Sequence, residues 1–540
     1  MNMKTILSLF FIFVFITSIS AQYTNVQIDN AGSPEEPSIA INPKNPLQVI
    51  AGANINFYYY SSNGGANWTK GTLVDNTSGV WGDPDMFFDT LGNAFFIHLA
   101  NPPSQGHWID RIVCAKSTNA GVTYGNPAPY FGRNLNSTIE MEDKAWVGVD
   151  WTHGPRGNWI YCTWTEFDTY NTSNPADSSR IYFVRSTNNG LNWTDPPKRI
   201  NGLSGDCLDG DNTMEGAVPV VGPNGELYDG WAGPKIWNSQ FGIYFQKSTD
   251  GGNTWLPAPT YVCDQKGGWD YPINGIYRAN GLPVTCCDIS NGPYRGNIYI
   301  NYTDEEPSST LHDVKLVKST NGGLNWSSPI RVNNDPVGKE QFFTWMTIDQ
   351  TTGYLYFVFY DRRNYTDNLT TDVYMARSTD GGATFTNFLV SSSPFVPNSG
   401  TFFGDYTNVS AVNGHVRPIW ARLQGGSLSV WTAIVEFPVA VQNENNSVPN
   451  SFALLQNYPN PFNPSTTVKF TVPAGHNGEN VSIRIYDMLG KEVSTLVNEN
   501  GMAPGTYEIT WHAENFSSGI YFSTMQAGNF TDTKKMILVK

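Results

Sequence analysis

Short runs of alternating apolar and polar residues recur along most of the chain. Residues 241–247 and 372–377 are two examples, and a side-chain period of two predicts β-strands for both. Such runs lead into a stretch of one pattern, Ser-x-Asp/Asn-x-Gly-x-x-aromatic, as in residues 248–255. Six copies of the stretch begin at Ser61, Ser117, Ser186, Ser248, Ser319 and Ser378. Starts that lie 56 to 71 residues apart indicate a repeat architecture.

The recurring stretch has the composition of a hairpin turn. The Asp or Asn side chain in its third position is expected to bond backbone groups two residues on, as in an Asx-turn. The glycine accepts a positive φ angle that other residues resist. The serine hydroxyl adds a local hydrogen bond, and the aromatic residue returns to the hydrophobic layer. Six near-identical turns fit a structural role better than a catalytic one, so we predict that they mark the fold.

The stretch resembles the Asp-box, or bacterial neuraminidase repeat, of sialidase-like β-propellers. This resemblance implies an all-β propeller in which each box joins the third and fourth strands of a blade, away from the active site. It leaves the reaction open, because propellers of this kind include sialidases, other glycosidases and non-catalytic binding proteins.

A second pattern of paired apolar runs precedes each box and outlines six blades. A seventh copy covers residues 405–420, and residues 428–435 supply a third strand that no box follows. Residues 23–29 are able to provide the missing fourth strand and close the ring, which removes exposed sheet edges. We predict a seven-bladed propeller over residues 22–437, with six blades as the alternative because known sialidases have six.

The chain changes character after the propeller. Residues 438–451 form a polar linker, and strand-and-turn alternation over residues 452–540 predicts a small immunoglobulin-like β-sandwich. Residues 457–464, 485–493 and 519–522 resemble the type A C-terminal sorting domain of the type IX secretion system. The resemblance implies export across an outer membrane, release or attachment at the cell surface, and the secretion machinery as a partner.

The two ends of the chain and its charge limit where the protein acts. Residues 1–21 combine a charged start, a short apolar core and small residues, which is typical of a secretory signal peptide. No other stretch approaches the ~20 apolar residues of a membrane span, so we expect no transmembrane anchor in the mature chain. A net charge of −15 and a pI near 4.9 argue against nucleic acid as a partner. Export permits disulfides, and we expect one or two, with Cys207 and Cys263 as candidates.

Acidic residues stand at or just before the first strand of nearly every predicted blade, where propeller loops converge on the channel. Such a ring supplies a general acid and a base for glycoside cleavage, or oxygen ligands for calcium. For a single carboxylate the alternative is a hydrogen bond to backbone amides at the end of a loop. The residues concerned are Glu35, Glu36, Asp83, Asp85, Glu142, Asp143, Glu215, Glu340 and Asp405.

The resemblance to sialidases implies roles for individual residues. In that family an Asp is the acid/base, and a Glu assists a Tyr nucleophile. Chain order implies Asp83 or Asp85 as the acid/base and Glu215 as the partner of Tyr406.

The same family binds the substrate carboxylate with three arginines, because a planar guanidinium pairs with a carboxylate through two bonds. Chain order implies Arg278 and Arg362 as two of them. The family's first arginine, which precedes the first box, has no counterpart, because the first arginine of this chain is Arg111. This departure argues against sialidase activity in the strict sense.

Three functions remain open at this point. The first is an exported hydrolase of extracellular glycans, sialylated or not, which needs two carboxylates ~5 to 10 Å apart in a pocket. The second is a non-catalytic propeller that binds polysaccharide or glycoprotein through exposed aromatic residues. The third is an adhesive or structural surface protein. The aromatic residues considered as sugar platforms are Trp81, Trp231, Trp237 and Trp269.

Overall fold

The computed structural model describes residues 23–540 except 105, 133–139, 209–211, 237–239, 269, 307–308, 337, 438–440, 444–448, 476–478, 501, 503 and 514–515. All elements of the described residues are β-strands, and they form nine four-stranded antiparallel sheets. The predicted signal peptide, residues 1–21, lies outside the described residues, as do Trp237 and Trp269.

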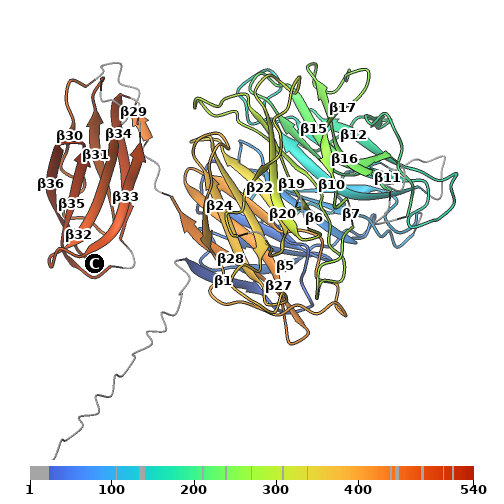
Figure 1. The fold of residues 1–540 in the computed structure, drawn as a ribbon, viewed down its shortest axis with the longest axis horizontal. Coiled ribbons are helices and arrows are strands. Elements are labelled where there is room, and N and C mark those ends of the chain that lie inside the picture. The colour runs from blue at the N-terminus through green and yellow to red at the C-terminus, as the bar shows by residue number, and fades with distance from the viewer. Residues whose placement is uncertain are drawn as a thin grey trace, which may run out of the picture.

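Seven of the sheets follow one another around a ring, and we call each of them a blade (Figure 1). Blade 1 contains β2 (Ser38–Ile41), β3 (Val49–Ala53), β4 (Phe57–Ser61) and β5 (Thr69–Thr72), and blade 2 contains β6 (Gly82–Phe88), β7 (Ala94–Leu99), β8 (Ile112–Ser117) and β9 (Tyr130–Phe131). Blade 3 contains β10 (Met141–Val149), β11 (Ile160–Phe167), β12 (Ser179–Ser186) and β13 (Lys198–Arg199), and blade 4 contains β14 (Glu215–Val221), β15 (Leu227–Ile236), β16 (Gln240–Ser248) and β17 (Thr260–Gln265).

The remaining three blades complete the ring. Blade 5 contains β18 (Val284–Cys287), β19 (Ile298–Glu305), β20 (His312–Ser319) and β21 (Ile330–Arg331). Blade 6 contains β22 (Gln341–Asp349), β23 (Tyr354–Asp361), β24 (Asp372–Ser378) and β25 (Thr386–Leu389). Blade 7 contains β26 (Asn408–Val412), β27 (His415–Gln424), β28 (Ser427–Glu436) and β1 (Thr24–Asp29).

The first strands of the seven blades contact one another around the central channel, and β26 of blade 7 contacts β2 of blade 1. The N-terminal strand β1 is the outermost strand of blade 7, where Thr24 pairs with Ile434 of β28. Figure 1 shows β1 and β28 side by side although they lie at opposite ends of the propeller sequence. The predictions of seven blades and of closure by residues 23–29 are therefore confirmed.

The second strand of most blades is buried on both faces, because neighbouring blades pack against each other. Every residue of β7 and of β11 is buried, and β23 is buried beyond its first residue. The sequences of these strands are therefore nearly continuous apolar runs, whereas a strand with one solvent-exposed face alternates between apolar and polar residues. The aromatic residues Tyr161, Tyr299 and Tyr356 are fully buried at these contacts.

Each of the six recurring turns joins the third and fourth strands of a blade. In the turn after β16, Gly252 N donates to Ser248 Oγ at 2.8 Å and Thr254 N donates to Asp250 Oδ1 at 2.8 Å. The Asp side chain thus bonds the backbone four residues on, and not two residues on as predicted. The same two bonds recur in the other five turns. Gly252 has a φ of +87°, as the turn requires.

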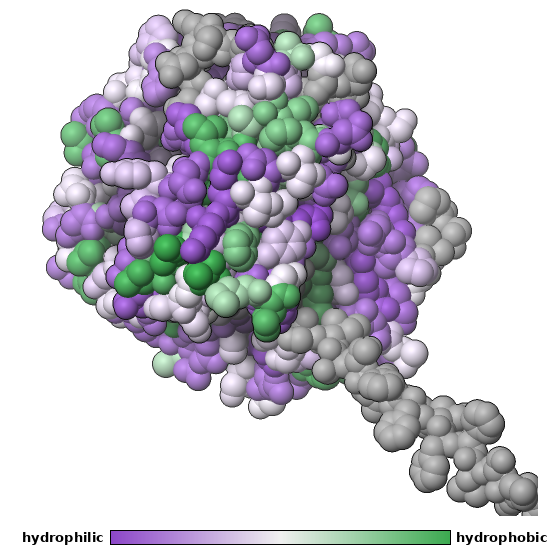
Figure 2. Space-filling model, turned by 90° about the vertical axis from the view of Figure 1, so that its left-hand side faces the viewer, coloured by the Kyte–Doolittle hydropathy of each residue, from purple (hydrophilic) through white to green (hydrophobic). Residues whose placement is uncertain are grey.

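The C-terminal tail forms the last two sheets. One contains β29 (Val441–Asn443), β34 (Gly505–His512), β31 (Ser465–Val472) and β30 (Ala453–Leu454), and the other contains β33 (Glu492–Asn500), β32 (Asn480–Asp487), β35 (Gly519–Ala527) and β36 (Phe530–Leu538). Phe470, Ile485 and Trp511 belong to one buried core that takes residues from both sheets, as in a sandwich. Figure 2 shows apolar residues in separate patches among polar ones on this side of the molecule.

Two further findings concern the cysteines and the membrane. All six cysteines lie in the described residues, and all six are free thiols, so the one or two disulfides expected, with Cys207 and Cys263 as candidates, do not form. Cys263 Sγ instead lies 3.3 Å from Tyr302 Oη. No helix long and apolar enough to cross a bilayer occurs among the residues that the structure describes.

Candidate functional site

The first strands of four blades carry the same irregularity near their starts. Their pairing register shifts between Gly82 and Asp85, Asp143 and Trp146, Glu215 and Val218, and Phe342 and Trp345. Inside each shift one residue has a positive φ, and the four are Asp83, Lys144, Gly216 and Phe343. A β-bulge of this kind redirects a side chain away from its regular place in the sheet. In blades 2 and 3 it brings charged side chains to one end of the channel.

A cavity of about 260 Å³ lies at that end, over blades 1 to 3. Its charged lining residues come from the starts of β6 and β10, from Glu35 and Glu36 just before β2, and from Arg278 in the loop between β17 and β18. Its aromatic lining residues come from loops between strands or blades. The full lining is Glu35, Glu36, Asn54, Ile55, Trp81, Asp83, Leu99, Trp108, Ile109, Asp143, Lys144, Tyr170, Arg278 and Phe402.

Lys144 lies at the centre of the charged group. Its Nζ is 2.8 Å from Asp405 Oδ2, 3.3 Å from Asp83 Oδ2 and 3.6 Å from Glu36 Oε1. Arg278 approaches Asp405 from the other side, with Nε donating to Oδ1 at 3.1 Å and Nη2 contacting Oδ2. Four blades therefore contribute to one cluster in which carboxylates outnumber cations.

The carboxyl groups of the cluster differ in pKa for physical reasons. Burial, followed by the Asp83 and Asp405 charges, raises the pKa of Glu35 to about 8. Burial acts in the same direction on Asp83 and Asp405, but the Lys144 ammonium holds both of their pKa values below the ordinary range, and Arg278 adds to the effect on Asp405. At neutral pH the cluster thus holds a protonated Glu35 beside ionised Asp83 and Asp405.

Burial and neighbouring charges also act in opposite directions on the pKa of Lys144. Burial alone would lower its pKa, but Asp405, Asp83 and Glu36 raise it well above the ordinary value. The ammonium is therefore charged throughout the physiological range, and it supplies a fixed positive charge among the carboxylates.

An aromatic cluster closes the cavity from below. Trp146 lies 4.6 Å from Trp345 and 4.9 Å from Tyr406, measured between ring centroids. Along β10 the order is Lys144 in the cavity, Trp146 in the aromatic cluster, and then Val147 in the wall of an apolar channel of about 230 Å³. Along β10 the aromatic cluster therefore lies between the cavity and the apolar channel.

Six of the predicted site residues line the cavity, three of which are the acidic residues Glu35, Glu36 and Asp143, and a seventh lies directly beneath it. Asp83, Arg278 and Trp81 belong to the lining, and the Trp81 side chain is 38% exposed. Tyr406 is buried under Lys144, whose Nζ is 5.8 Å from the ring centroid. Burial, followed by the charges of Asp83 and Glu36, raises the pKa of Tyr406 well above its ordinary value.

Asp85 and Glu215 do not line the cavity. Asp85 accepts a hydrogen bond from Val147 N at 2.9 Å inside the contact between blades 2 and 3, and burial raises its pKa to about 7. Glu215 is buried at the start of β14. The carboxyl groups that raise the pKa of Tyr406 are those of Asp83, Glu36 and Glu35, all of which line the cavity.

Arg362 and Trp231 lie away from the cavity as well. Arg362 is fully buried and donates to Asn368 O and Asn274 O, both at 2.8 Å, so it binds backbone in place of a substrate carboxylate. Trp231 is 1% exposed in the core of blade 4. The prediction that Trp231 is an exposed platform is wrong, because its neighbours on both faces of β15 cover it.

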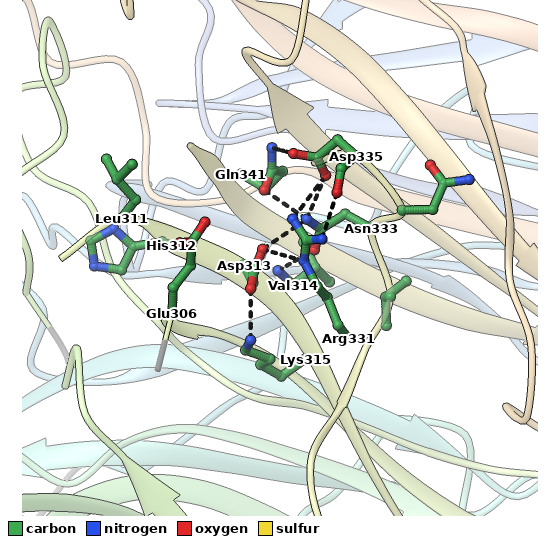
Figure 3. Close-up of polar contacts among 12 residues, drawn as sticks. Glu306, Leu311, His312, Asp313, Val314, Lys315, Arg331, Asn333, Asp335 and Gln341 are labelled. Atoms are coloured by element: carbon green, nitrogen blue, oxygen red, sulfur yellow. Dashed lines mark hydrogen bonds and ion pairs between the residues drawn. The ribbon is translucent and has the colours of Figure 1, made fainter. Parts of the chain in front are cut away.

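Charged residues elsewhere in the propeller bond to one another. Figure 3 shows such a network at the edge of blade 5, where Asp313 lies between Lys315 at 2.8 Å and Arg331 at 2.6 Å. Asn333 Nδ2 donates to Asp335 Oδ1 at 2.7 Å in the same network. The predicted ring member Glu340 is also engaged, since its Oε2 accepts from His312 N at 3.1 Å. These groups stabilise loops and are not part of the cavity.

The cluster does not have the composition of a calcium site. Carboxylates around a bound cation would need to direct several oxygens to one point, and here the Lys144 ammonium occupies that position among Glu36, Asp83 and Asp405. Within the described part of the chain, no group of three or more His, Cys, Asp or Glu side chains has the geometry of a metal site.

Sequence reasoning gave no role to Lys144, Trp108, Tyr170 or Phe402. A signal for Lys144 exists, because Gly82-Asp-Pro, Asp143-Lys-Ala and Glu215-Gly-Ala stand at equivalent places before inner-strand apolar runs, and Lys144 occupies the place of Asp83. The three aromatic residues lie in loops without a shared pattern, so only the folded chain brings them together.

The comparisons with known proteins concern the two parts of the chain separately. Residues 456–540 match the family described as "Secretion system C-terminal sorting domain". The tail resembles that family throughout. A search among curated proteins found no match.

The propeller is similar to several solved structures at low identity. They include the GH93 α-L-arabinofuranosidase of Fusarium graminearum (10% identity, TM-score 0.43, covering 77% of this chain and 98% of that chain) and the Trypanosoma rangeli sialidase (12%, 0.40, 86% and 85%). A third is the Penicillium chrysogenum α-L-arabinanase (13%, 0.39, 63% and 93%). Likenesses at this level of identity say nothing of the residues in the cavity.

Proposed function

We propose that the protein is an exported glycoside hydrolase that cleaves neutral glycans in the cavity at the mouth of the propeller. The observation that supports it most directly is the pairing of Glu35, whose pKa is raised to about 8, with Asp83, whose pKa is lowered, in one cavity. Two carboxyl groups whose surroundings separate their pKa values are suited to acid and base roles.

Glu35 fits the general acid. Glu35 lines the cavity, and its buried Oε2 has no hydrogen-bond partner among the described residues, which leaves this oxygen as the candidate proton donor. Glycoside cleavage requires such a proton on the leaving oxygen, because an alkoxide is a poor leaving group.

Asp83 fits the base. It stays ionised beside Lys144 and faces the same cavity as Glu35. In the proposed step Glu35 gives its proton to the glycosidic oxygen, the bond from that oxygen to the anomeric carbon breaks, and water adds to the anomeric carbon. The proton that the water loses goes to Asp83. The negative charge of the Asp83 carboxylate also stabilises the positive charge that develops on the sugar ring.

The charge of the cavity favours neutral sugars over sialic acid. Arg278 is the only arginine among the described residues that line it, and both of its bonds to Asp405 are made. Lys144 is likewise shared among carboxylates. A substrate carboxylate would therefore meet the ionised Asp83 without an unpaired guanidinium, and like charges repel strongly where water is excluded.

The walls of the cavity suit a sugar ring. Trp81 stands edge-on to Trp108 at 5.5 Å, and Trp108 stands edge-on to Tyr170 at 5.5 Å. An aromatic face can cover the apolar face of a pyranose or furanose while the hydroxyl groups of the sugar reach the carboxylates. An apolar wall with a few polar groups is typical of ligand pockets.

The test measures reducing-sugar release by the purified protein from arabinan, xylan and mannan and from a sialylated glycoprotein. We expect release from a neutral polysaccharide, and a loss of at least about 10²-fold in Glu35→Gln and Asp83→Asn. Asp264→Asn is the matched control, because Asp264 is 61% exposed and pairs with Lys235 away from the cavity.

The tail completes the proposal. A sorting-domain match at residues 456–540 supports export by the type IX system, with the propeller delivered to the cell surface or the medium.

Retention of the protein on arabinan, xylan or mannan without any release of sugar would reject hydrolysis and support a binding protein.

A further inference from the structure

Tyr277 is a large aromatic side chain that lies in the open beside the cavity. It is 62% exposed, and its ring stands edge-on to Phe402 with centroids 5.9 Å apart. Phe402 lines the cavity. We propose that Tyr277 and Phe402 form a second sugar-binding platform, so that the site holds a chain of neutral sugars extending to both sides of the carboxylates. This inference rests on the proposed function.

The two aromatic walls come from different arcs of the ring. Trp81 and Trp108 belong to loops of blade 2, whereas Tyr277 precedes blade 5 and Phe402 precedes blade 7. The carboxyl groups of Glu35 and Asp83 stand between these arcs at the starts of blades 1 and 2. A glycan that contacts both walls therefore crosses the catalytic pair, and its sugars on either side of the cleaved bond are bound.

Phe402 is held at a fixed distance from the carboxylates. The Arg278 guanidinium lies over the Phe402 ring at 5.4 Å from its centroid while it pairs with Asp405. The guanidinium therefore joins the platform to the cluster, and a sugar on the platform has a defined position relative to Asp405 and Lys144.

The loop that carries Tyr277 is also rigid. Arg362 Nη2 donates to Asn274 O at 2.8 Å, and Tyr271 Oη donates to Asn280 O at 2.7 Å. Ile273 and Ile276 are buried in the core between blades. Because its supports are buried, Tyr277 is presented in one orientation, and a prearranged ring loses little conformational entropy when a ligand binds.

Tyr277 is not an isolated exposed ring, because it adjoins Phe402, which lines the cavity together with Trp81. Contiguous apolar surface of this kind marks a binding site, whereas apolar residues exposed singly do not. Tyr277 contributes to no buried core cluster of the described residues, so the fold does not require it. Its ring offers a flat apolar face and a hydroxyl group, which is the combination that packs on a sugar ring and bonds its edge.

The experiment compares chain lengths. KM and kcat are measured with the full-length protein on a one-sugar aryl glycoside and on oligosaccharides of two to six sugars from the polysaccharide that it cleaves. Tyr277→Ala should raise KM about tenfold for the longer oligosaccharides and leave the aryl glycoside unchanged. Tyr277→Phe keeps the ring and should behave as the wild type. Leu324→Ala removes another exposed apolar side chain, 78% exposed and outside the cavity, and serves as the control.

Equal KM values for Tyr277→Ala and Leu324→Ala at every chain length would overturn the inference. If the wild type cleaves nothing, hydrolysis is rejected, and the platform is then tested by retention on gels containing arabinan, xylan or mannan. Retention that is lost in Tyr277→Ala and kept in Tyr277→Phe would support the platform. Retention that is equal in both variants, or absent in the wild type, would reject it.

Discussion

The ammonium of Lys144 in blade 3 lies 2.8 Å from the carboxylate of Asp405, which precedes blade 7 and lies 261 residues later in the chain. This contact joins opposite parts of the ring, and Asp83 and Glu36 approach the same ammonium. All four side chains are nearly or fully buried. Their charges therefore depend on one another for both stability and reactivity.

Lys144→Met should lower the free energy of unfolding by about 3–5 kcal/mol, because it leaves buried carboxylates without their cation. The loss should be smaller at pH 5 than at pH 8, since protonation relieves the unpaired charge. Urea unfolding at both pH values measures this. The double variant Lys144→Met with Asp405→Asn should lose less than the sum of the two single changes, and additive losses would show that the pair is not coupled.

The pH dependence of activity should report Glu35. Its pKa of about 8 predicts that kcat/KM stays level near neutral pH and falls tenfold per unit above pH 8, as the acid loses its proton. Asp264→Asn should keep this profile. A wild-type profile without a decline between pH 7 and pH 10 would mean that Glu35 is not the acid.

Stability should depend on the same proton. Glu35 of the unfolded chain loses its proton near 4.5, whereas the folded chain keeps it to about 8. Between these values the unfolded state binds fewer protons, so the free energy of unfolding falls as pH rises, and the Glu35 contribution is lost above pH 8. In Glu35→Gln this part of the slope should vanish, as measured by urea unfolding from pH 4 to pH 9. A slope identical to that of the wild type would contradict the raised pKa.

Gly252→Ala should destabilise the propeller more than Gly426→Ala. Both glycines have positive φ, +87° and +81°, so both substitutions carry a conformational cost of about 1–2 kcal/mol. A Cβ on Gly252 would also lie 2.3 Å from the Phe183 ring, whereas nothing lies within 4 Å of one on Gly426. Overpacking adds about 1–3 kcal/mol. Thermal unfolding distinguishes the two, and equal Tm values would show that the turn has room.

Arg362→Lys should destabilise the protein by about 3 kcal/mol, because a lysine cannot replace the fork that reaches Asn368 O and Asn274 O, and buried carbonyls are left unpaired. Arg199→Lys is the control, since Arg199 makes comparable bonds in an exposed position. A stable Arg362→Lys variant that no longer binds an anionic glycan would instead support a role in substrate binding.

The blades could be predicted from sequence because their signals are local. The turn after each third strand repeats within eight residues, and the seventh blade keeps the strand pattern although no turn of this kind follows it. Closure by β1 followed from the missing fourth strand, since an unpaired edge is unfavourable.

The site could be predicted only in part, because bulges decide which side chains face the cavity. Asp83 and Asp85 are two residues apart and would share a face of a regular strand. The register shift between Gly82 and Asp85 separates them, so that Asp83 lines the cavity and Asp85 enters the contact between blades. Nothing near Arg362 in the sequence indicates that it would bind backbone carbonyls 6 and 88 residues away.

The pairing of β1 with β28 also governs when the propeller becomes complete. The first strand of the ring has its partner in residues 427–436, so during synthesis or translocation from the N-terminus it waits for nearly the whole propeller to emerge. Pairing over such a sequence separation is slow, because a long loop must be ordered before the contact forms. The tail follows directly after β28. The last strand that the ring needs is therefore made shortly before residues 456–540, the part of the chain that matches the sorting-domain family.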